Sequence, residues 1–118
     1  MTQVEFAHKN IVTDLMRNIA KIERLPTKMI CKRIREGKIV ILNNNQHIVK
    51  KPCAVGLGLR TKVNANIGSS SDCIRITDEL KKLEIAIKYG ADTVMDLSIG
   101  GDLKKIRRQI IKHSSIPV

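Results

Sequence analysis

Aromatic residues, long apolar runs and a secretion signal are all missing or scarce in this chain of 118 residues. One Phe, one Tyr and no Trp are present, so the core has to be built from aliphatic side chains. No apolar run approaches the roughly 20 residues that span a bilayer, and the first residues lack the pattern of a signal peptide. We therefore expect a cytoplasmic protein without a membrane partner.

The cysteines are too scattered to predict a metal site or a disulfide framework. Cys31, Cys53 and Cys73 lie far apart in the sequence, whereas zinc and redox motifs place two cysteines within a few positions of each other. Their odd number also argues against complete pairing. We expect reduced, partly buried thiols and no metal ligands in this chain.

The net charge of +11 is the strongest bias in the composition. Such basicity suits RNA or another anionic partner, but a lysine-rich solvated surface gives the same value. No aromatic side chains are interleaved with the cations to stack on bases, which argues against nucleic acid. With 42% hydrophobic and 28% charged residues, the chain fits one modest folded domain.

Helical periodicity dominates the first part of the chain. It predicts a helix over 10–24 with Thr13 as N-cap, and a second helix over 27–36 that ends at Gly37. The β-branched run 38–42 predicts a strand, the Asn-rich residues 43–46 a turn, and 47–51 the return strand of a hairpin. Residues 1–52 are thus predicted to form a small α+β region of helices and a hairpin.

The second part alternates strands and helices. Strands are predicted over 61–67 and 92–97, with a helix over 77–89 and another from Asp102, whose Leu103, Ile106 and Ile110 would face inward. This order predicts an α/β fold with a parallel sheet over 53–118. Loops then gather at the carboxyl ends of the strands, where such folds bind ligands.

The first of these strands has one polar face. Alternation places Lys62, Asn64 and Asn66 on that face and apolar residues on the other. Two amides and an ammonium group suggest a polar ligand at the end of the strand. A solvated edge strand explains the same pattern.

Two segments that follow the strands could bind an anion. The Ser-rich residues 68–72 could present N–H groups and hydroxyls, and Gly100-Gly101 precedes a helix N-terminus, which suits phosphate. An ordinary loop and a tight strand-to-helix turn account for them equally well, so both interpretations stay open here.

The segments RTKVNANIG at 60–68 and GADTVMDLS at 90–98, followed by Gly100-Gly101-Asp102, resemble the amino-terminal region of phosphomethylpyrimidine synthases, the ThiC family of thiamine biosynthesis. The resemblance extends along the chain and includes the strand that starts at Gly37. It implies a radical carbon–carbon lyase, built as a (β/α)8 barrel, that converts aminoimidazole ribotide to 4-amino-5-hydroxymethyl-2-methylpyrimidine phosphate. The two βα units would then be the first two of an incomplete TIM-type barrel.

The resemblance also implies cofactors and site residues. The family uses S-adenosylmethionine, a [4Fe–4S] cluster held by a three-cysteine motif near the carboxyl terminus, and a divalent metal such as zinc held by two histidines. None of these ligands is matched in this chain. Asn66 and Met95 match substrate-binding positions, and no residue matches a catalytic one. Ile99 stands where the family usually has Thr.

These features leave three hypotheses for the chain. We expect the amino-terminal portion of a radical enzyme, from a truncated, split or fragmentary gene, which is inactive by itself. It could also complete a barrel with a separate downstream chain, or form a homodimer as the family commonly does. The third hypothesis is a non-enzymatic remnant that binds RNA or another anion through its basic helices.

Overall fold

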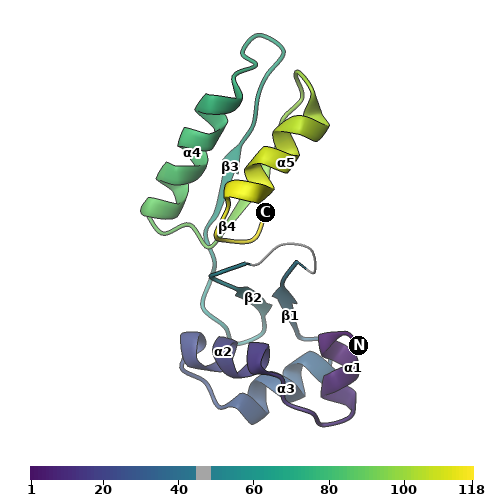
Figure 1. Cartoon of the computed structure of the whole chain (residues 1–118). Helices are drawn as coiled ribbons and strands as arrows, with labels where there is room; N and C mark the ends of the chain where they lie inside the picture. The colour runs from purple at the N-terminus through teal and green to yellow at the C-terminus, as the bar shows by residue number, and fades with distance from the viewer. Residues whose placement is uncertain (45–48) are drawn as a thin grey trace. The chain divides into compact units, whose positions relative to one another are not determined.

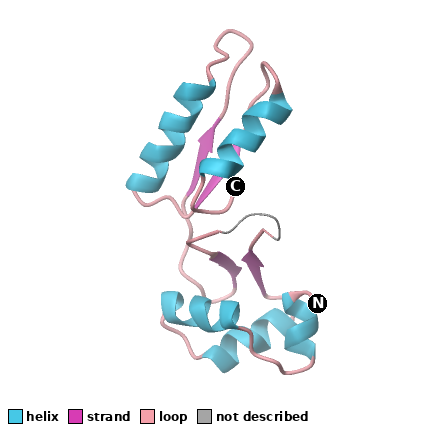
Figure 2. Ribbon diagram, viewed as in Figure 1, coloured by secondary structure: helices cyan, strands magenta, loops and turns pink. Residues whose placement is uncertain are grey.

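A computed structural model describes residues 1–44 and 49–118, which form two structural units. Unit 1 comprises Met1–Leu42 and Pro52–Thr61, and unit 2 comprises Asn43–Lys51 and Lys62–Val118. Helices and short strands occur in both units (Figures 1 and 2). The chain is therefore a mixed α/β protein, and no helix of the described part is long and apolar enough to cross a membrane.

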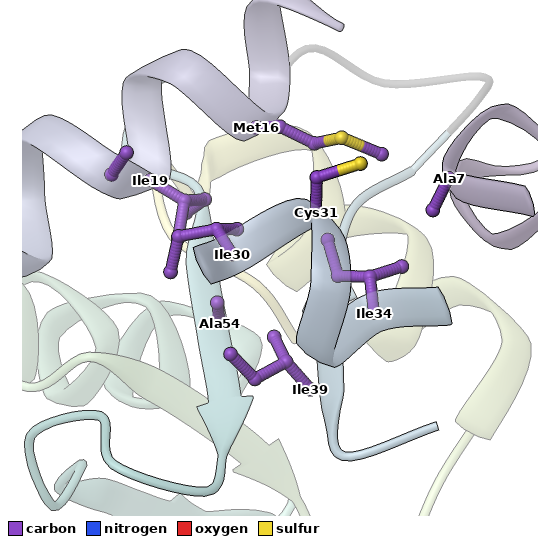
Figure 3. Close-up of a cluster of buried hydrophobic side chains, with 9 residues drawn as sticks. Ala7, Met16, Ile19, Ile30, Cys31, Ile34, Ile39 and Ala54 are labelled. Atoms are coloured by element: carbon purple, nitrogen blue, oxygen red, sulfur yellow. The ribbon is translucent and has the colours of Figure 1, made fainter. Parts of the chain in front are cut away.

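Unit 1 packs three helices against a two-stranded sheet. The helices are α1 (Gln3–His8), α2 (Asp14–Glu23) and α3 (Thr27–Arg35), and the strands are β1 (Ile39–Leu42) and β2 (Cys53–Gly56). Figure 3 shows their shared aliphatic core, which includes Ala7, Met16, Ile19, Ile30, Cys31, Ile34, Ile39 and Ala54. The buried side chains of this core are aliphatic or sulfur-containing, as expected, whereas Phe6 packs against it only partly buried.

The helix ends in unit 1 follow local signals. Thr13 caps α2 as predicted, because its hydroxyl accepts a hydrogen bond from the Met16 N–H at 3.2 Å. Gly37 follows α3 with φ +69°, and the Lys38 N–H bonds to the Arg33 carbonyl at 2.8 Å, which confirms the predicted helix end. The predicted start at residue 10 is wrong, because Asn10 adopts φ +57° between α1 and α2.

Helix α1 was not predicted, although its N-terminal signal is present in the sequence. The Thr2 side chain accepts from the Glu5 N–H, and the Glu5 carboxylate accepts from the Thr2 N–H. This reciprocal pair is a capping box, which satisfies two N–H groups at the helix start. Six residues are too few for helical periodicity to be visible, so only the capping pattern could have revealed α1.

The predicted partner of the first strand is wrong. Strand β1 pairs antiparallel with β2, so that Ile39 lies opposite Gly56 and Leu42 opposite Cys53. The structure does not describe residues 45–48, so part of the expected turn at 43–46 and part of the expected strand at 47–51 lie outside the described residues. The described remainder of that strand, residues 49–51, forms no strand. Burial explains the choice: Ala54 packs in the core of unit 1, whereas the exposed side chains of Lys50 and Lys51 cannot.

Unit 2 contains two βα units. They are β3 (Asn64–Ile67) with α4 (Ile76–Lys88), and β4 (Thr93–Asp96) with α5 (Leu103–His113). The strands pair in parallel, as predicted, with Asn64 beside Thr93 and Asn66 beside Met95 (Figure 1). The predicted helix end at Gly90 is also confirmed by its φ of +88° and the bond from Ala91 N–H to Ala86 carbonyl.

Both helices of unit 2 cover the same face of the sheet. Ile67 and Val94 from the strands, Leu83 from α4, and Ile106 and Ile110 from α5 share one buried cluster. Leu103 was expected in this core but is 37% exposed. It occupies the first position of α5, one turn before Ile106 reaches the strands.

After α5 the chain returns to the sheet. The Val94 N–H donates to the Pro117 carbonyl at 3.0 Å, and Ile116 is buried in the unit 2 core. The Thr93 and Leu97 N–H groups bond toward β3 instead. Because successive N–H groups of a strand point to opposite edges, Pro117 lies on the edge of β4 that faces away from β3.

Candidate functional site at the carboxyl ends of β3 and β4

The sheet of unit 2 has one face that its helices do not cover. Asn64, Asn66, Thr93 and Met95 occupy this open face, because Ala65, Ile67 and Val94 alternate with them and pack toward the helices. Asn66 and Met95 are register partners, and Met95 is 48% exposed. The structure thus brings the two predicted substrate-binding residues side by side, in space accessible to a ligand.

Hydrogen bonds connect three of these side chains in a row. The Thr93 hydroxyl donates to Asn64 Oδ1 at 2.7 Å, and Asn64 Nδ2 donates to Asn66 Oδ1 at 3.1 Å. Lys62, the third predicted member of the polar face, precedes β3 and is not part of the strand. The row therefore fixes the amide of Asn66 from one side only.

The Ser-rich loop after β3 bonds to the loop after β4. Ser69 is buried, its N–H donates to Ser98 Oγ at 3.1 Å, and its hydroxyl donates to the Gly100 carbonyl at 2.7 Å. The Ile99 N–H returns a bond to the Ser69 carbonyl at 2.9 Å. These donors hold two loops together, so the loop is not preformed to receive an anion.

The two glycines before α5 serve a tight turn. A Cβ on Gly100 would lie 2.3 Å from the Ser70 carbonyl oxygen, and Gly101 has φ +84°. The Asp102 carboxylate caps α5 by accepting from the Lys105 N–H at 3.0 Å. Because a negative side chain already occupies the helix start, the geometry favours the turn over the phosphate interpretation.

A buried carboxylate that the sequence analysis did not assign supports the end of β3. Glu79 on α4 is 2% exposed, and it accepts from the Gly68 N–H and from Lys82 Nζ, each at 2.7 Å. The hydrogen bond that Lys82 donates to Glu79 raises the pKa of Lys82 above its ordinary value. The sequence does indicate that Glu79 is buried, because it lies three residues after Ile76 and four before Leu83 and so falls on the apolar stripe of the helix.

Ile99, the departure from the family pattern, lies on the surface. Its side chain is 76% exposed, while its N–H is bonded to Ser69. The loop pairing therefore uses the backbone of residue 99 and does not depend on its side chain.

The cysteines do not form a cluster site. Cys31 and Cys53 are buried in unit 1, whereas Cys73 is exposed in unit 2, and none of the three forms a disulfide. Among the described residues no three His, Cys, Asp or Glu side chains are grouped so that they could hold a metal ion. These thiols do not fit an iron–sulfur cluster, which needs several thiolates around one center.

The chain is thus an α/β protein with a parallel strand–helix layer and an open polar face at its strand ends, the place where proteins of this class bind ligands. The sequence model of the Radical SAM ThiC family matches residues 2–118. The chain belongs to this family.

Phosphomethylpyrimidine synthases from three organisms align over the whole chain. The identity is 48% for the protein of Pyrococcus furiosus, 51% for that of Sulfurisphaera tokodaii and 49% for that of Thermodesulfovibrio yellowstonii. The chain spans 27–28% of the length of these curated relatives. The chain therefore corresponds to a little more than a quarter of the length of each of these synthases.

Proposed function

We propose that this chain contributes part of the substrate site of a phosphomethylpyrimidine synthase. In this proposal β3 and β4 are the first two strands of a (β/α)8 barrel, and their carboxyl ends hold aminoimidazole ribotide. The pairing of Asn66 with Met95 on the open sheet face carries the proposal, because ligands of such folds bind at strand ends.

Each of the two residues has a distinct part in binding. The Asn66 carboxamide supplies hydrogen bonds to polar atoms of the imidazole or ribose. The Met95 thioether is a polarizable apolar group, and it packs against the face of the planar ring. Together they position the ribotide and exclude water from one side of it.

S-adenosylmethionine and an iron–sulfur cluster, which the family's name implies, would supply the radical chemistry when bound. The cysteines of this chain do not fit the cluster, and no grouping of the described residues could hold a zinc ion, so both groups would need ligands beyond those that the structure describes. We therefore propose that the 118-residue chain binds but does not convert the substrate. Formation of the pyrimidine phosphate by the purified, reconstituted chain would contradict this.

Titration of the isotope-labelled chain with aminoimidazole ribotide tests the binding role. We expect the Asn66 side-chain amide and the Met95 methyl resonances to shift in a saturable way, and Asn66→Ala or Met95→Ala to weaken binding severalfold. Val63→Ala is the matched control, because Val63 is 59% exposed and precedes β3. Equal affinity of all three variants and the unmodified chain would refute the proposed site.

The outer face of α5 gives the second candidate function, binding of an anionic polymer such as RNA. Its exposed cations are Lys104, Lys105, Arg107, Arg108 and Lys112. Neutralised phosphates release counterions, so such binding would fall steeply with salt. Affinity for single-stranded RNA that is unchanged between low and physiological salt, or absent at both, would eliminate this candidate.

A further inference from the structure

We infer that Thr93 and Asn64 are positioning residues that orient the Asn66 carboxamide, so that Asn66 presents its Nδ2 N–H groups and recognises a hydrogen-bond acceptor. The inference rests on the proposed function for the identity of the ligand. The orientation of the amide follows from the hydrogen-bonded row on the open face of the sheet.

The row has a direction that its distances indicate. The Thr93–Asn64 contact is 2.7 Å, the usual length of an O–H···O bond, and the Asn64–Asn66 contact is 3.1 Å, within the range of N–H···O bonds. In the reversed row the 2.7 Å contact would be an N–H···O bond at the short end of its range. The Thr93 hydroxyl donates its one hydrogen to Asn64 Oδ1, so the oxygen of the Asn64 amide faces Thr93 and its Nδ2 faces Asn66.

The orientation of the Asn64 amide in turn fixes the orientation of the Asn66 amide. Its Oδ1 accepts from Asn64, and no described residue accepts from its Nδ2. A carboxamide nitrogen can donate two hydrogen bonds but cannot accept one. Asn66 therefore offers donors at the place where Met95 lies beside it.

This polarity selects among the groups of a ribotide. Aminoimidazole ribotide carries acceptors at its unsubstituted ring nitrogen and at its oxygens, and donors at its exocyclic amine. The unsubstituted nitrogen is the acceptor on the ring itself, so with Met95 proposed against the ring face we assign this nitrogen to Asn66 Nδ2. The exocyclic amine is then directed away from this residue.

The row itself is tested without a ligand, from the side-chain amide resonances of the labelled chain. Thr93→Val removes the hydroxyl with little change in shape, and we expect it to move the amide resonances of both Asn64 and Asn66. Thr93→Ser keeps the hydroxyl and should restore them. Unchanged Asn66 resonances in Thr93→Val, with the backbone spectrum of unit 2 retained, would overturn the inference.

Aminoimidazole ribotide then tests the polarity and the role in binding. We expect the Asn66 Nδ2 protons to move downfield on binding, and Thr93→Val to weaken binding about threefold to tenfold, as loss of one net hydrogen bond would, with recovery in Thr93→Ser. Nδ2 protons that stay in place while the Met95 methyl responds would overturn the assigned polarity. Asn66→Ala could leave binding unchanged while Thr93→Val still moves the Asn66 amide resonances of the ligand-free chain. That result would refute the proposed function but would leave the hydrogen-bonded row supported.

Discussion

Replacing Glu79 by alanine should destabilise unit 2 by about 2–4 kcal/mol. The carboxylate is 2% exposed and accepts the Gly68 N–H at 2.7 Å. Leaving that donor without an acceptor costs about 1–3 kcal/mol, and losing one buried methylene adds about 0.8 kcal/mol. The ion pair with Lys82 adds little, because the Lys82 side chain is 52% exposed.

Urea denaturation followed by circular dichroism measures this change, and amide hydrogen exchange locates it. The Gly68 amide should lose protection in Glu79→Ala and keep most of it in Glu79→Gln, which retains an acceptor oxygen. Glu84→Ala is the matched control on the exposed face of the same helix, and it should change the stability by less than about 0.5 kcal/mol. Equal effects of the Glu79→Ala and Glu84→Ala substitutions would refute the role of Glu79 in holding the end of β3.

Three further predictions concern packing, loop contact and a helix cap. Ile110→Ala should cost about 2–5 kcal/mol of unfolding free energy, because Ile110 is completely buried. Gly100→Ala should cost about 1–3 kcal/mol, because the new methyl group would lie 2.3 Å from the Ser70 carbonyl oxygen; thermal melting measures this. Hydrogen bonds from Thr2 hold the pKa of Glu5 below its ordinary value of 4.5, so the cap stabilises α1 above that pH and is lost as the pH falls through the lowered pKa. An NMR titration of Glu5 should show a higher pKa in Thr2→Val.

Each of these predictions has a specific control. Leu103→Ala, on α5 but partly exposed, should cost clearly less than Ile110→Ala. Ser71→Ala, in the loop that Gly100 approaches but exposed, should leave the melting temperature nearly unchanged. A Glu5 pKa that is the same with threonine and valine at position 2 would show that the hydroxyl does not bond to the carboxylate.

The elements that the sequence predicted best are those whose periodicity and end signals agree. Thr13 and Gly37 mark helix ends, and Ile106 and Ile110 are buried as their spacing indicated. The partner of β1 could not be predicted from local pattern, because 47–51 and 53–56 both follow a turn-prone segment. Burial of Ala54 in the core of unit 1 decides between them, and burial is a property of the tertiary structure.

The candidate site shows the same limit. Strand alternation placed Asn64 and Asn66 on one face, but the pairing of Asn66 with Met95 depends on the register between two strands 29 residues apart. The hydrogen bonds of Ser69 and Ser98 join loops that are equally distant in sequence. A sequence pattern reports which residues could bind a ligand, whereas the competing internal bonds appear only in the fold.

The register of β3 and β4 also makes the open face sensitive to insertions within either strand. Side chains of a strand alternate between the two faces, so sliding β4 by one residue would exchange them. Met95 would then point toward the helices, and Val94 or Asp96 would replace it beside Asn66. One extra residue within β4 itself, unlike one in the turn at 89–92, would therefore change which side chain lies beside Asn66 on the open face.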